Sequence, residues 1–405
     1  MSIAGSRVGI VGGSIAGCAM AVAAWRLGCD VTVFEASSGD LEDRGAGIFI
    51  PLPLRHELVV SGYLAPDAPY CHPPERLWVT ADPEEPTGRV MWRHDFPGAA
   101  HNWGVLWRGL RSLVPAAAYR KGSVVACQPE PDEVTVILDD GSTERFDVLV
   151  GADGYRSSVR RAVRPDVRPA YAGYVLWRGN YDEHRLANPA VAAILDQGFV
   201  TVCFPGGHAI IYLIPGRNGR TGPGERRIIW ALYGSPPPGM DFTEPLSIPP
   251  GDVPRALADR LEEILDRHLP SAWTDLVRTG GPDVLSVQPI YDHAVPAFVT
   301  GRVVLVGDAA TLSRPHTAGG VTKAMQEALA FEAAGSTHGS WPQLLAAFDA
   351  ARCPVATEIV EASRLLGHGL VEHTPDWTAM SEQQAEQFIA GTIAGRNLYM
   401  QPSAP

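Results

Sequence analysis

The chain has 405 residues, of which 45% are hydrophobic and 19% charged, and this is the composition of a folded protein with one large or two moderate domains. Its net charge of −12 disfavours nucleic acids and anionic membrane surfaces as partners. The six cysteines form no C-x-x-C pair, which favours a cytoplasmic enzyme and disfavours a zinc site or a disulfide framework. We predict no metal site. Glycines interrupt the apolar stretch 8–24, so we expect neither a signal peptide nor a membrane span there.

The N-terminal residues predict a βαβ unit. The run RVGIV at 7–11 is typical of a short buried strand, residues 15–27 of an alanine-rich helix, and residues 31–35 of a second strand that ends in Glu35. The sequence GGSIAG at 12–17 joins the first strand to the helix. Strand, glycine turn, helix, strand and acid, in that order, indicate a dinucleotide-binding unit.

Each position of this first glycine box has a physical role. Gly12 permits the tight turn, Gly17 lets the helix approach the strand, and the helix N-terminus offers free amides to a pyrophosphate. Ser14 stands where a glycine is usual, but it is small and its hydroxyl can donate to a phosphate. Glu35 can accept from ribose hydroxyls and would repel a 2′-phosphate. The box therefore predicts FAD or NAD, not NADP.

The middle of the chain changes character at about residue 170. Before it we predict a helix at 103–114, strands at 134–138 and 146–150 around a turn at 139–141, and a helix that Gly151-Ala152-Asp153-Gly154 caps. A dense basic run in that helix is predicted to be a solvated face: Arg156, Arg160, Arg161, Arg164 and Arg168. After it, short runs between Pro/Gly turns predict an antiparallel sheet with strands at 174–178, 199–204, 209–214 and 228–233.

The last third predicts helices at 253–268, 320–335 and 341–366, with a break near Pro354. Between the first two lies a buried strand at 303–306 that runs into a second glycine box, Gly307-Asp308-Ala309-Ala310. Asp308 is thereby placed at the carboxyl end of a strand, where open α/β sheets bind ligands. The loop from Arg314 to Gly320 leads into a helix whose positive end would stabilise an anion, such as a reduced flavin. The second glycine box therefore predicts that the bound dinucleotide is FAD and not NAD.

Taken together, these motifs resemble the class A FAD-dependent aromatic monooxygenases, the para-hydroxybenzoate hydroxylase-like family. The first glycine box with Glu35, the middle element DVLVGADG at 147–154 and the Gly307-Asp308 element carry the resemblance across almost the whole chain. Within the family, residues 171–179 and 313–316 are most similar to the 2,6-dihydroxypyridine hydroxylase branch. Thr311 and Arg314 depart from the family pattern, which usually has histidine and proline there.

The resemblance implies an α/β fold. A Rossmann-like FAD-binding domain of the glutathione reductase type would comprise 1–72, 104–170 and 285–335. A mostly antiparallel substrate-binding sheet domain would comprise 73–103 and 171–284, followed by a C-terminal helical region, 336–405. The predicted FAD contacts are Gly12, Ser14, Ile15, Ala16, Gly17, Glu35, Arg44, Arg108, Asp153, Asp308, Pro315, Gly319 and Gly320.

The resemblance also implies the chemistry. FAD, held tightly but not covalently, is reduced by transiently bound NAD(P)H and captures O₂ as a flavin C4a-hydroperoxide, which hydroxylates an electron-rich aromatic or N-heteroaromatic ring. His316, Tyr212 and Arg178 are the predicted catalytic residues, and the base and the oligomeric state stay open, a homodimer among the options. The wider set of substrate candidates adds Trp177, His208, Trp230, Tyr233, Tyr291 and His293; for His208, in a turn, we expect solvent exposure.

Several alternatives stay open. A Baeyer–Villiger or ring-opening oxygenase on the same fold differs in its product and barely in its sequence. A flavin-dependent halogenase is disfavoured because the Trp-x-Trp-x-Ile-Pro element is missing from the sequence. A flavoprotein that only sequesters a ligand would show no substrate-stimulated NAD(P)H oxidation. A plain NAD-dependent dehydrogenase is disfavoured by the Gly307-Asp308 element.

Overall fold

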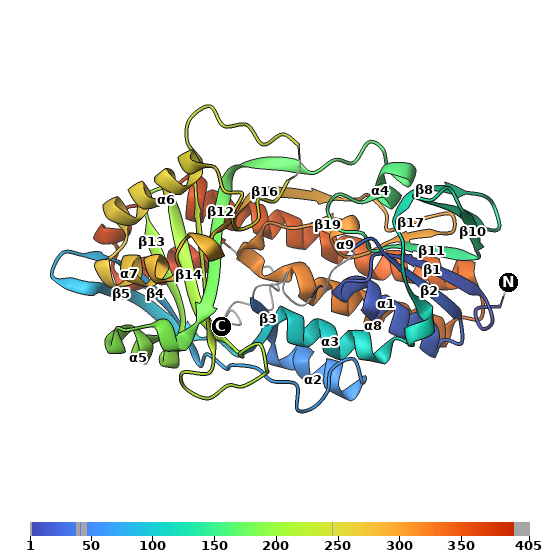
Figure 1. Cartoon of the computed structure of the whole chain (residues 1–405), viewed down its shortest axis with the longest axis horizontal. Helices are drawn as coiled ribbons and strands as arrows, with labels where there is room; N and C mark the ends of the chain where they lie inside the picture. The colour runs from blue at the N-terminus through green and yellow to red at the C-terminus, as the bar shows by residue number, and fades with distance from the viewer. Residues whose placement is uncertain (1, 38–40, 42–46, 245, 393–405) are drawn as a thin grey trace.

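The computed structural model describes residues 2–37, 41, 47–244 and 246–392. Its two main sheets lie at opposite ends of the long axis (Figure 1). No helix within these ranges is long and apolar enough to cross a membrane.

The first sheet has six strands and forms the predicted dinucleotide-binding unit. Its central strands are parallel, and β18 additionally pairs antiparallel with the short edge strand β17. The strand order is β17 (Val299–Thr300), β18 (Val303–Leu305), β11 (Val148–Gly151), β1 (Arg7–Val11), β2 (Asp30–Glu35) and β7 (Tyr119–Lys121). Buried β-branched residues dominate these strands, as expected of parallel strands covered on both faces.

Helices cover one face of this sheet. α1 (Ile15–Arg26) packs between α8 (Gly319–Thr337) and α3 (Trp103–Leu113), and α9 (Trp341–Gly367) packs on α8. On the other face lies a three-stranded sheet, β8 (Val124–Pro129), β9 (Val134–Leu138) and β10 (Thr143–Phe146), whose buried valines belong to the same core. The short α4 (Ser158–Val163) follows β11.

Two sequence predictions in this region are wrong in detail. The turn at 139–141 joins β9 to β10, and the predicted strand 146–150 is split: β10 ends at Phe146, and β11 pairs in parallel with β1. Asp147 lies between them, where its carboxylate accepts from the Arg7 amide at 2.7 Å and its own amide donates to the Arg7 carbonyl at 2.9 Å. α9 continues through Pro354 without a break, because packing against α8 along its length outweighs one missing amide hydrogen bond.

The second sheet has eight strands. The predicted antiparallel strands form its centre, and β13 pairs in parallel with β4. The order is β19 (Thr311–Leu312), β16 (Ser286–Ala294), β12 (Ala170–Asp182), β15 (Arg227–Gly234), β14 (Gly207–Ile214), β13 (Gly198–Phe204), β4 (Glu75–Asp82) and β5 (Glu85–Asp95). β16 therefore lies in this sheet, whereas the predicted FAD-binding domain includes residues from 285 onward. The sheet topology favours a boundary between the two domains near residue 295.

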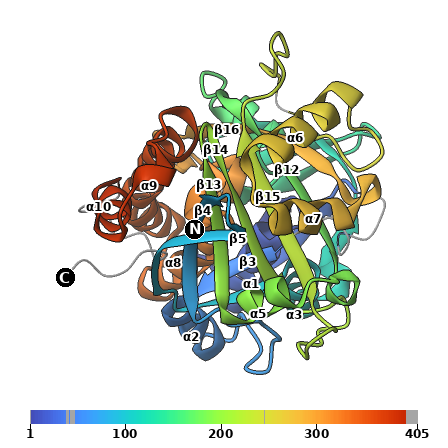
Figure 2. The ribbon, with the colours of Figure 1, turned by 90° about the vertical axis from the view of Figure 1, so that its left-hand side faces the viewer.

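The eight-stranded sheet has a core on each face. Its outer face is covered by α5 (Pro189–Gln197), α6 (Arg255–His268) and α7 (Ser271–Gly280) (Figure 2). The opposite face, called here the inner face, carries Tyr174, Arg178, Ile210, Tyr212 and Tyr233. It packs partly on the end of α9 and on α10 (Glu382–Thr392), and partly on Phe49 of β3 (Gly47–Pro51), which pairs with β6 (Gly98–Asn102). The remaining helix, α2 (Leu52–Val60), follows β3.

Candidate cofactor and substrate site

The first glycine box forms a cradle that side chains would fill. Gly12 has φ +101°, and a Cβ there would lie 2.4 Å from the Ala152 carbonyl oxygen; a Cβ on Gly17 would lie 1.8 Å from the Gly12 carbonyl oxygen. Ser14 is the N-cap of α1, but its side chain makes no capping hydrogen bond. The first intrahelical bond runs from the Cys18 amide to the Ser14 carbonyl, so the amides before it point out of the helix end. This arrangement fits a pyrophosphate.

Glu35 holds the turn of this box. One carboxylate oxygen accepts from the Gly13 amide and the other from the Ser37 amide, both at 2.8 Å. The Gly13 carbonyl in turn accepts from the Trp107 indole at 2.9 Å and from the Tyr119 hydroxyl at 3.1 Å. The two aromatic residues, which the sequence analysis did not single out, therefore fix the backbone that would face the dinucleotide.

The second glycine box meets the first in space. Gly307–Ala309 forms a short 3-10 turn directly after β18, and Gly307 has φ +58°. A Cβ on Gly307 would lie 2.9 Å from the Cβ of Ala16, so the two boxes touch although about 290 residues separate them. The Asp308 side chain keeps 43% of its surface exposed, which leaves its carboxylate accessible to a polyol chain.

Two buried residues of α8 support this second turn. Glu327 accepts from the Gly307 amide at 2.6 Å, and the Lys323 ammonium donates to an Asp308 carboxylate oxygen at 3.3 Å. The Lys323 side chain is only 1% exposed. Burial raises the pKa of Glu327, with the charges of Lys323 and Arg352 opposing that rise. The turn therefore rests on an acid and a base from one helix.

Arg160 supports the same turn from the other side. It is 2% exposed, and its guanidinium donates to the carbonyls of Ala309 and Tyr155 at 3.1 and 2.6 Å. It also lies 3.2 Å from His293 Nε2, and burial together with this cation lowers the pKa of His293 to about 3. The prediction of a solvated face is therefore wrong for Arg160, because α4 turns this side chain toward the Gly-Asp loop.

The remaining predicted cofactor contacts differ in what they touch. Asp153 caps α4: its carboxylate accepts from the Ser157 hydroxyl at 2.5 Å and from the Ser158 amide at 2.7 Å. Arg108 donates to the Arg217 carbonyl at 3.1 Å, across to the loop between β14 and β15. Pro315 lies in a 3-10 turn before α8, which Gly319 and Gly320 begin. Arg44 lies outside the described residues. FAD contacts through these residues remain predictions.

The inner face of the large sheet has two half-buried positions, Ile210 and Arg178, which are together called here the opening. Ile210 is the half-buried position in an otherwise buried β14. It lies in register with Ala231 on β15, which lies opposite Arg178 on β12. Arg178 is half-buried too, and its guanidinium has no hydrogen-bond or ion-pair partner among the residues the structure places. Burial raises the pKa of the Tyr155 hydroxyl, and among the smaller influences the charge of Arg178 lowers it and that of Asp308 raises it.

His316 lies at the edge of this opening and is held as a neutral imidazole. Its Nε2 is 2.7 Å from the Tyr174 hydroxyl, and its ring lies 4.6 Å from that of Tyr233 and 5.2 Å from that of His208. Burial, followed by the charges of His208, Arg314 and Arg76, keeps the pKa of His316 well below its usual range. Its Nδ1 is buried and has no partner in the described chain.

Tyr212 lies nearby, stacked on Phe199 at 4.7 Å, and burial raises its pKa. A Cβ on Gly47 would lie 2.5 Å from the Tyr212 hydroxyl, so this side chain reaches the start of β3. The three residues predicted to be catalytic, His316, Tyr212 and Arg178, thus lie on or beside the inner face. Their chemical roles remain predictions.

Other candidate residues are placed differently from expectation. His208 is buried in β14 and stacks on Tyr233 at 4.6 Å, so the expectation of solvent exposure is wrong. Trp177 and Trp230 point to the outer face, where the Trp177 indole donates to the Leu257 carbonyl of α6 at 2.9 Å. Tyr291 also faces outward and donates to the Phe242 carbonyl at 2.7 Å. The two-residue period of a strand excludes these three from the inner face.

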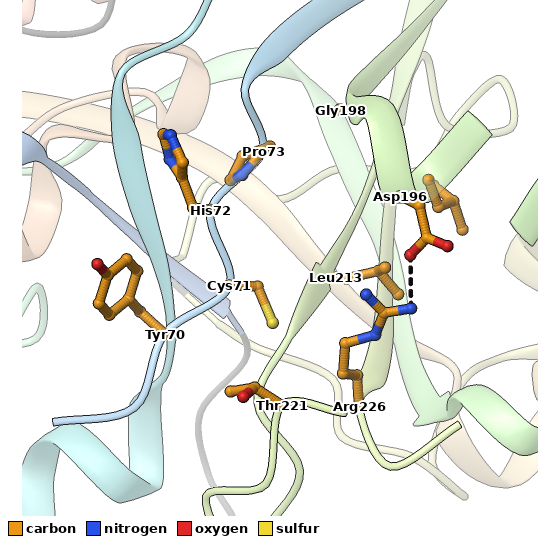
Figure 3. A pocket seen from close by; sticks show the side chains of 10 residues that line it. Tyr70, Cys71, His72, Pro73, Asp196, Gly198, Leu213, Thr221 and Arg226 are labelled. Carbon is orange, nitrogen blue, oxygen red and sulfur yellow. Dashed lines mark hydrogen bonds and ion pairs between the residues drawn. The ribbon is translucent and has the colours of Figure 1, made fainter. Parts of the chain in front are cut away.

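A separate pocket of about 220 Å³ lies between the start of β13 and the segment after α2 (Figure 3). Cys71 and His72 line it on one side, and Arg226 on the other, where the guanidinium pairs with Asp196 at 2.6 Å. Arg226 also pairs with the buried Glu183. No residue predicted to touch FAD or substrate lines this pocket.

The comparisons with known proteins bear on this geometry. Residues 171–288 match a family model described as FAD binding domain-like. The chain is 29% identical to 2,6-dihydroxypyridine 3-monooxygenase of Paenarthrobacter nicotinovorans, over 81% of this chain and 82% of that protein. It is 28% identical to 3-amino-4-hydroxybenzoate 2-monooxygenase of Streptomyces cremeus, over 91% and 88%. The solved 2,6-dihydroxypyridine-3-hydroxylase of Arthrobacter nicotinovorans superposes with a TM-score of 0.81 at 24% identity, covering 93% of this chain and 96% of that one.

The curated relatives and the solved structure that match this chain are class A FAD-dependent aromatic monooxygenases, as the motifs predict. The chain is an oxidoreductase, its cofactor is FAD, and the predicted fold class is confirmed. The glycine cradle, the free amides of α1 and the accessible carboxylate of Asp308 fit that cofactor.

Proposed function

We propose that this monooxygenase uses NAD(P)H and O₂ to hydroxylate an electron-rich aromatic or N-heteroaromatic small molecule. The observations that support the proposal are the contact between the two glycine boxes and the half-buried Arg178 on the inner face, whose guanidinium has no hydrogen-bond or ion-pair partner among the described residues. A planar ring at the opening would lie between the FAD-binding residues and the sheet. A relative that oxidises a dihydroxypyridine and one that oxidises an aminohydroxybenzoate support a substrate of this size and electron richness.

The residues that would hold FAD are those of the two boxes. The α1 N-terminus would take the pyrophosphate, Glu35 the adenosine ribose and Asp308 the ribityl chain, with Lys323 and Glu327 holding Asp308 and its turn in place. Bound FAD would supply two-electron chemistry with NAD(P)H and O₂. Gly319 and Gly320 begin α8, whose positive end would stabilise negative charge near the Pro315 loop.

The protein's own contribution is position, charge and exclusion of water. Arg178, whose guanidinium has no hydrogen-bond or ion-pair partner among the described residues, would stabilise negative charge on the reacting partners. His316 offers a buried Nδ1 without a protein partner, and we propose that it hydrogen-bonds the hydroxyl of the substrate. The aromatic wall of Tyr212, Phe199 and Tyr233 would keep water from the ring.

The test is a screen for substrate-stimulated oxidation of NADH and of NADPH by the FAD-loaded protein, with product masses. Hydroxylated pyridines, phenols and polycyclic aromatics form the panel. Stimulation with gain of one oxygen atom on an intact ring supports hydroxylation. Insertion of oxygen into the ring or chain, with ring opening, would favour the Baeyer–Villiger or ring-opening alternative. Lack of any visible flavin absorbance after FAD addition would overturn the proposal altogether.

All six cysteines are free thiols in the structure, and four are buried. We propose a cytoplasmic enzyme, where NAD(P)H is supplied and thiols stay reduced.

A further inference from the structure

The chain leaves α9 through a π-helical turn that carries three potential metal ligands. This turn spans His368–Glu372 and directly follows Gly367, the last residue of α9. His368, Glu372 and His373 are all exposed, and one ligand atom from each lies within 4.8 Å of the other two. Among the described residues this is the one group of three or more such side chains that lies close enough together to hold an ion.

The π turn brings the two histidines together. Its hydrogen bond runs from the His373 amide to the His368 carbonyl, five residues back, at 2.7 Å. In an α-helix of 3.6 residues per turn, residues five apart point about 140° away from each other. The wider turn aligns them instead, with ring centroids 4.2 Å apart and planes 30° from parallel. The sequence HGLVEH at 368–373 therefore gathers three ligands only when this turn forms, a feature that the sequence prediction of no metal site does not include.

Glu372 is held between this histidine pair and the rest of the protein. Its Oε2 lies 3.5 Å from Nδ1 of His368, and its Oε1 accepts from the Arg314 guanidinium at 2.5 Å. Arg314 is itself fixed at 2.8 Å by Asp292, which is 3% exposed. Carboxylates that bind metals in proteins are commonly hydrogen-bonded to a further residue in this way. One oxygen of Glu372 is thus oriented by the protein, and the other faces the histidine ring.

The distances fit a tetrahedral ion after small side-chain rotations. Metal–ligand bonds of about 2.0–2.1 Å place the ligand atoms of a tetrahedral site about 3.4 Å apart. The distance between His368 and Glu372 already matches this value, and the exposed ring of His373 can rotate to close the remaining gap. Two imidazoles and one carboxylate are a ligand set that holds zinc in proteins, with a water in the fourth position.

The surrounding charges select the kind of cation. Arg314 and Arg364 both pair with Asp292, and Arg314 also pairs with Glu372, so that two guanidinium groups balance two carboxylates. A hard cation such as Mg²⁺ or Ca²⁺ depends on several oxygen ligands, and this site offers it only one carboxylate. Imidazole nitrogens instead suit zinc, copper and nickel, which bond to them strongly.

We propose that His368, Glu372 and His373 form a binding site for one divalent transition-metal ion of the zinc class, completed by water. The ion would hold the π turn in its wide form. It would also fix the carboxylate that pairs with Arg314, two residues before His316 in the chain. The site uses no residue predicted to bind FAD, so it is independent of the proposed function.

The experiment measures the zinc that the FAD-loaded full chain retains, prepared without a polyhistidine tag. The protein is dialysed against buffered free Zn²⁺ in an excess of Mg²⁺, and the bound zinc is determined by elemental mass spectrometry. One Zn²⁺ per chain is expected. His368→Gln and His373→Gln should each weaken zinc binding at least about tenfold, because losing even an outer partner of a metal ligand costs that factor. Zn²⁺ should raise the melting temperature of the wild type but not that of either variant.

His56→Gln is the matched control, because His56 is an exposed histidine of α2 next to a second exposed carboxylate, Glu57. It should leave both zinc binding and the shift in melting temperature unchanged. FAD content and the melting temperature without zinc show whether each variant is folded. A wild type that retains no zinc, or that loses it to the excess of Mg²⁺, would overturn the proposal. Retention that neither His368→Gln nor His373→Gln weakens would also overturn it, and none of these results bears on hydroxylation.

Discussion

Replacing Gly307 with alanine tests whether contact between the two glycine boxes builds the FAD site. Gly307 has φ +58°, and an added Cβ would lie 2.9 Å from the Cβ of Ala16. The left-handed conformation costs a non-glycine residue about 1–2 kcal/mol. Forcing two packed groups apart costs about 1–3 kcal/mol more. Gly307→Ala should therefore lower the free energy of unfolding by about 2–5 kcal/mol.

Gly301 provides a matched control. It has the same φ of +58°, but a Cβ there meets nothing within 4 Å, so Gly301→Ala carries the backbone strain alone. Urea unfolding of the two variants separates strain from contact. Dissociation constants for FAD test the site: Gly301→Ala should match the wild type, and Gly307→Ala should bind FAD at least about tenfold more weakly, which corresponds to about 1.4 kcal/mol.

A second substitution makes the prediction sharper. Ala16→Gly removes the other partner of the contact, so Gly307→Ala combined with Ala16→Gly should recover most of the lost FAD affinity. Ala16→Gly alone measures the cost of glycine in α1, roughly 0.5–1 kcal/mol of stability. Equal losses in Gly307→Ala and Gly301→Ala, or a double variant no better than Gly307→Ala, would refute the claim that the boxes meet here.

Three further predictions follow from buried groups. The free energy of unfolding in urea should fall as the pH drops from about 6.5 toward 5, because the unfolded chain binds protons that His208 and His293, with pKa values of about 3, do not bind in the folded state. His208→Phe should make this pH dependence less steep. An unchanged pH dependence in that variant would contradict the explanation. Arg160→Met should weaken FAD binding at least about tenfold, since it removes two hydrogen bonds on the loop carbonyls, each worth roughly 1 kcal/mol or more; wild-type affinity by fluorescence titration would contradict this. Trp177→Phe should lower the free energy of unfolding by about 1–3 kcal/mol through loss of the bond to Leu257, yet leave the KM of any substrate within about twofold; a larger change in KM would place this residue at the site after all.

More of the cofactor site than of the substrate site could be predicted from the sequence. Gly12, Glu35 and Asp308 are set by local chemistry: a turn that needs positive φ, an acid at a strand end, and a carboxylate after a buried parallel strand. Such motifs are recognised within a stretch of about 30 residues of chain. The contact between Ala16 and Gly307 follows from two neighbouring strand ends in one parallel sheet.

The substrate half depends on which face of a strand a side chain takes, and on what that face meets. Trp177 and Arg178 are neighbours in the sequence, yet one lies in the outer core and the other at the opening. The two-residue period of a strand predicts that these two side chains lie on opposite faces of the sheet, but it does not predict which of them faces the outer core. His208 looked exposed because it follows a Gly-Gly turn, and only the packing of Leu370 and Tyr233 over it buries the ring.

Buried charges were the hardest to predict. Arg160 lies in a run of five arginines, and nothing in that run distinguishes the one that faces inward. Arg76 follows a proline pair in a segment without clear periodicity, and its burial is a property of the folded sheet. The burial of these two arginines is known only when the positions of the strands and of α4 in the fold are known.

The central claim is that FAD held between these boxes serves to hydroxylate an aromatic ring over the inner face. The most direct measurement uses ¹⁸O₂ and NAD(P)H with the best binder from the panel, followed by mass spectrometry of the product. The account predicts an intact ring that has gained one ¹⁸O atom from O₂. A product without the label, or NAD(P)H oxidation that yields hydrogen peroxide alone with every compound of the panel, would contradict it.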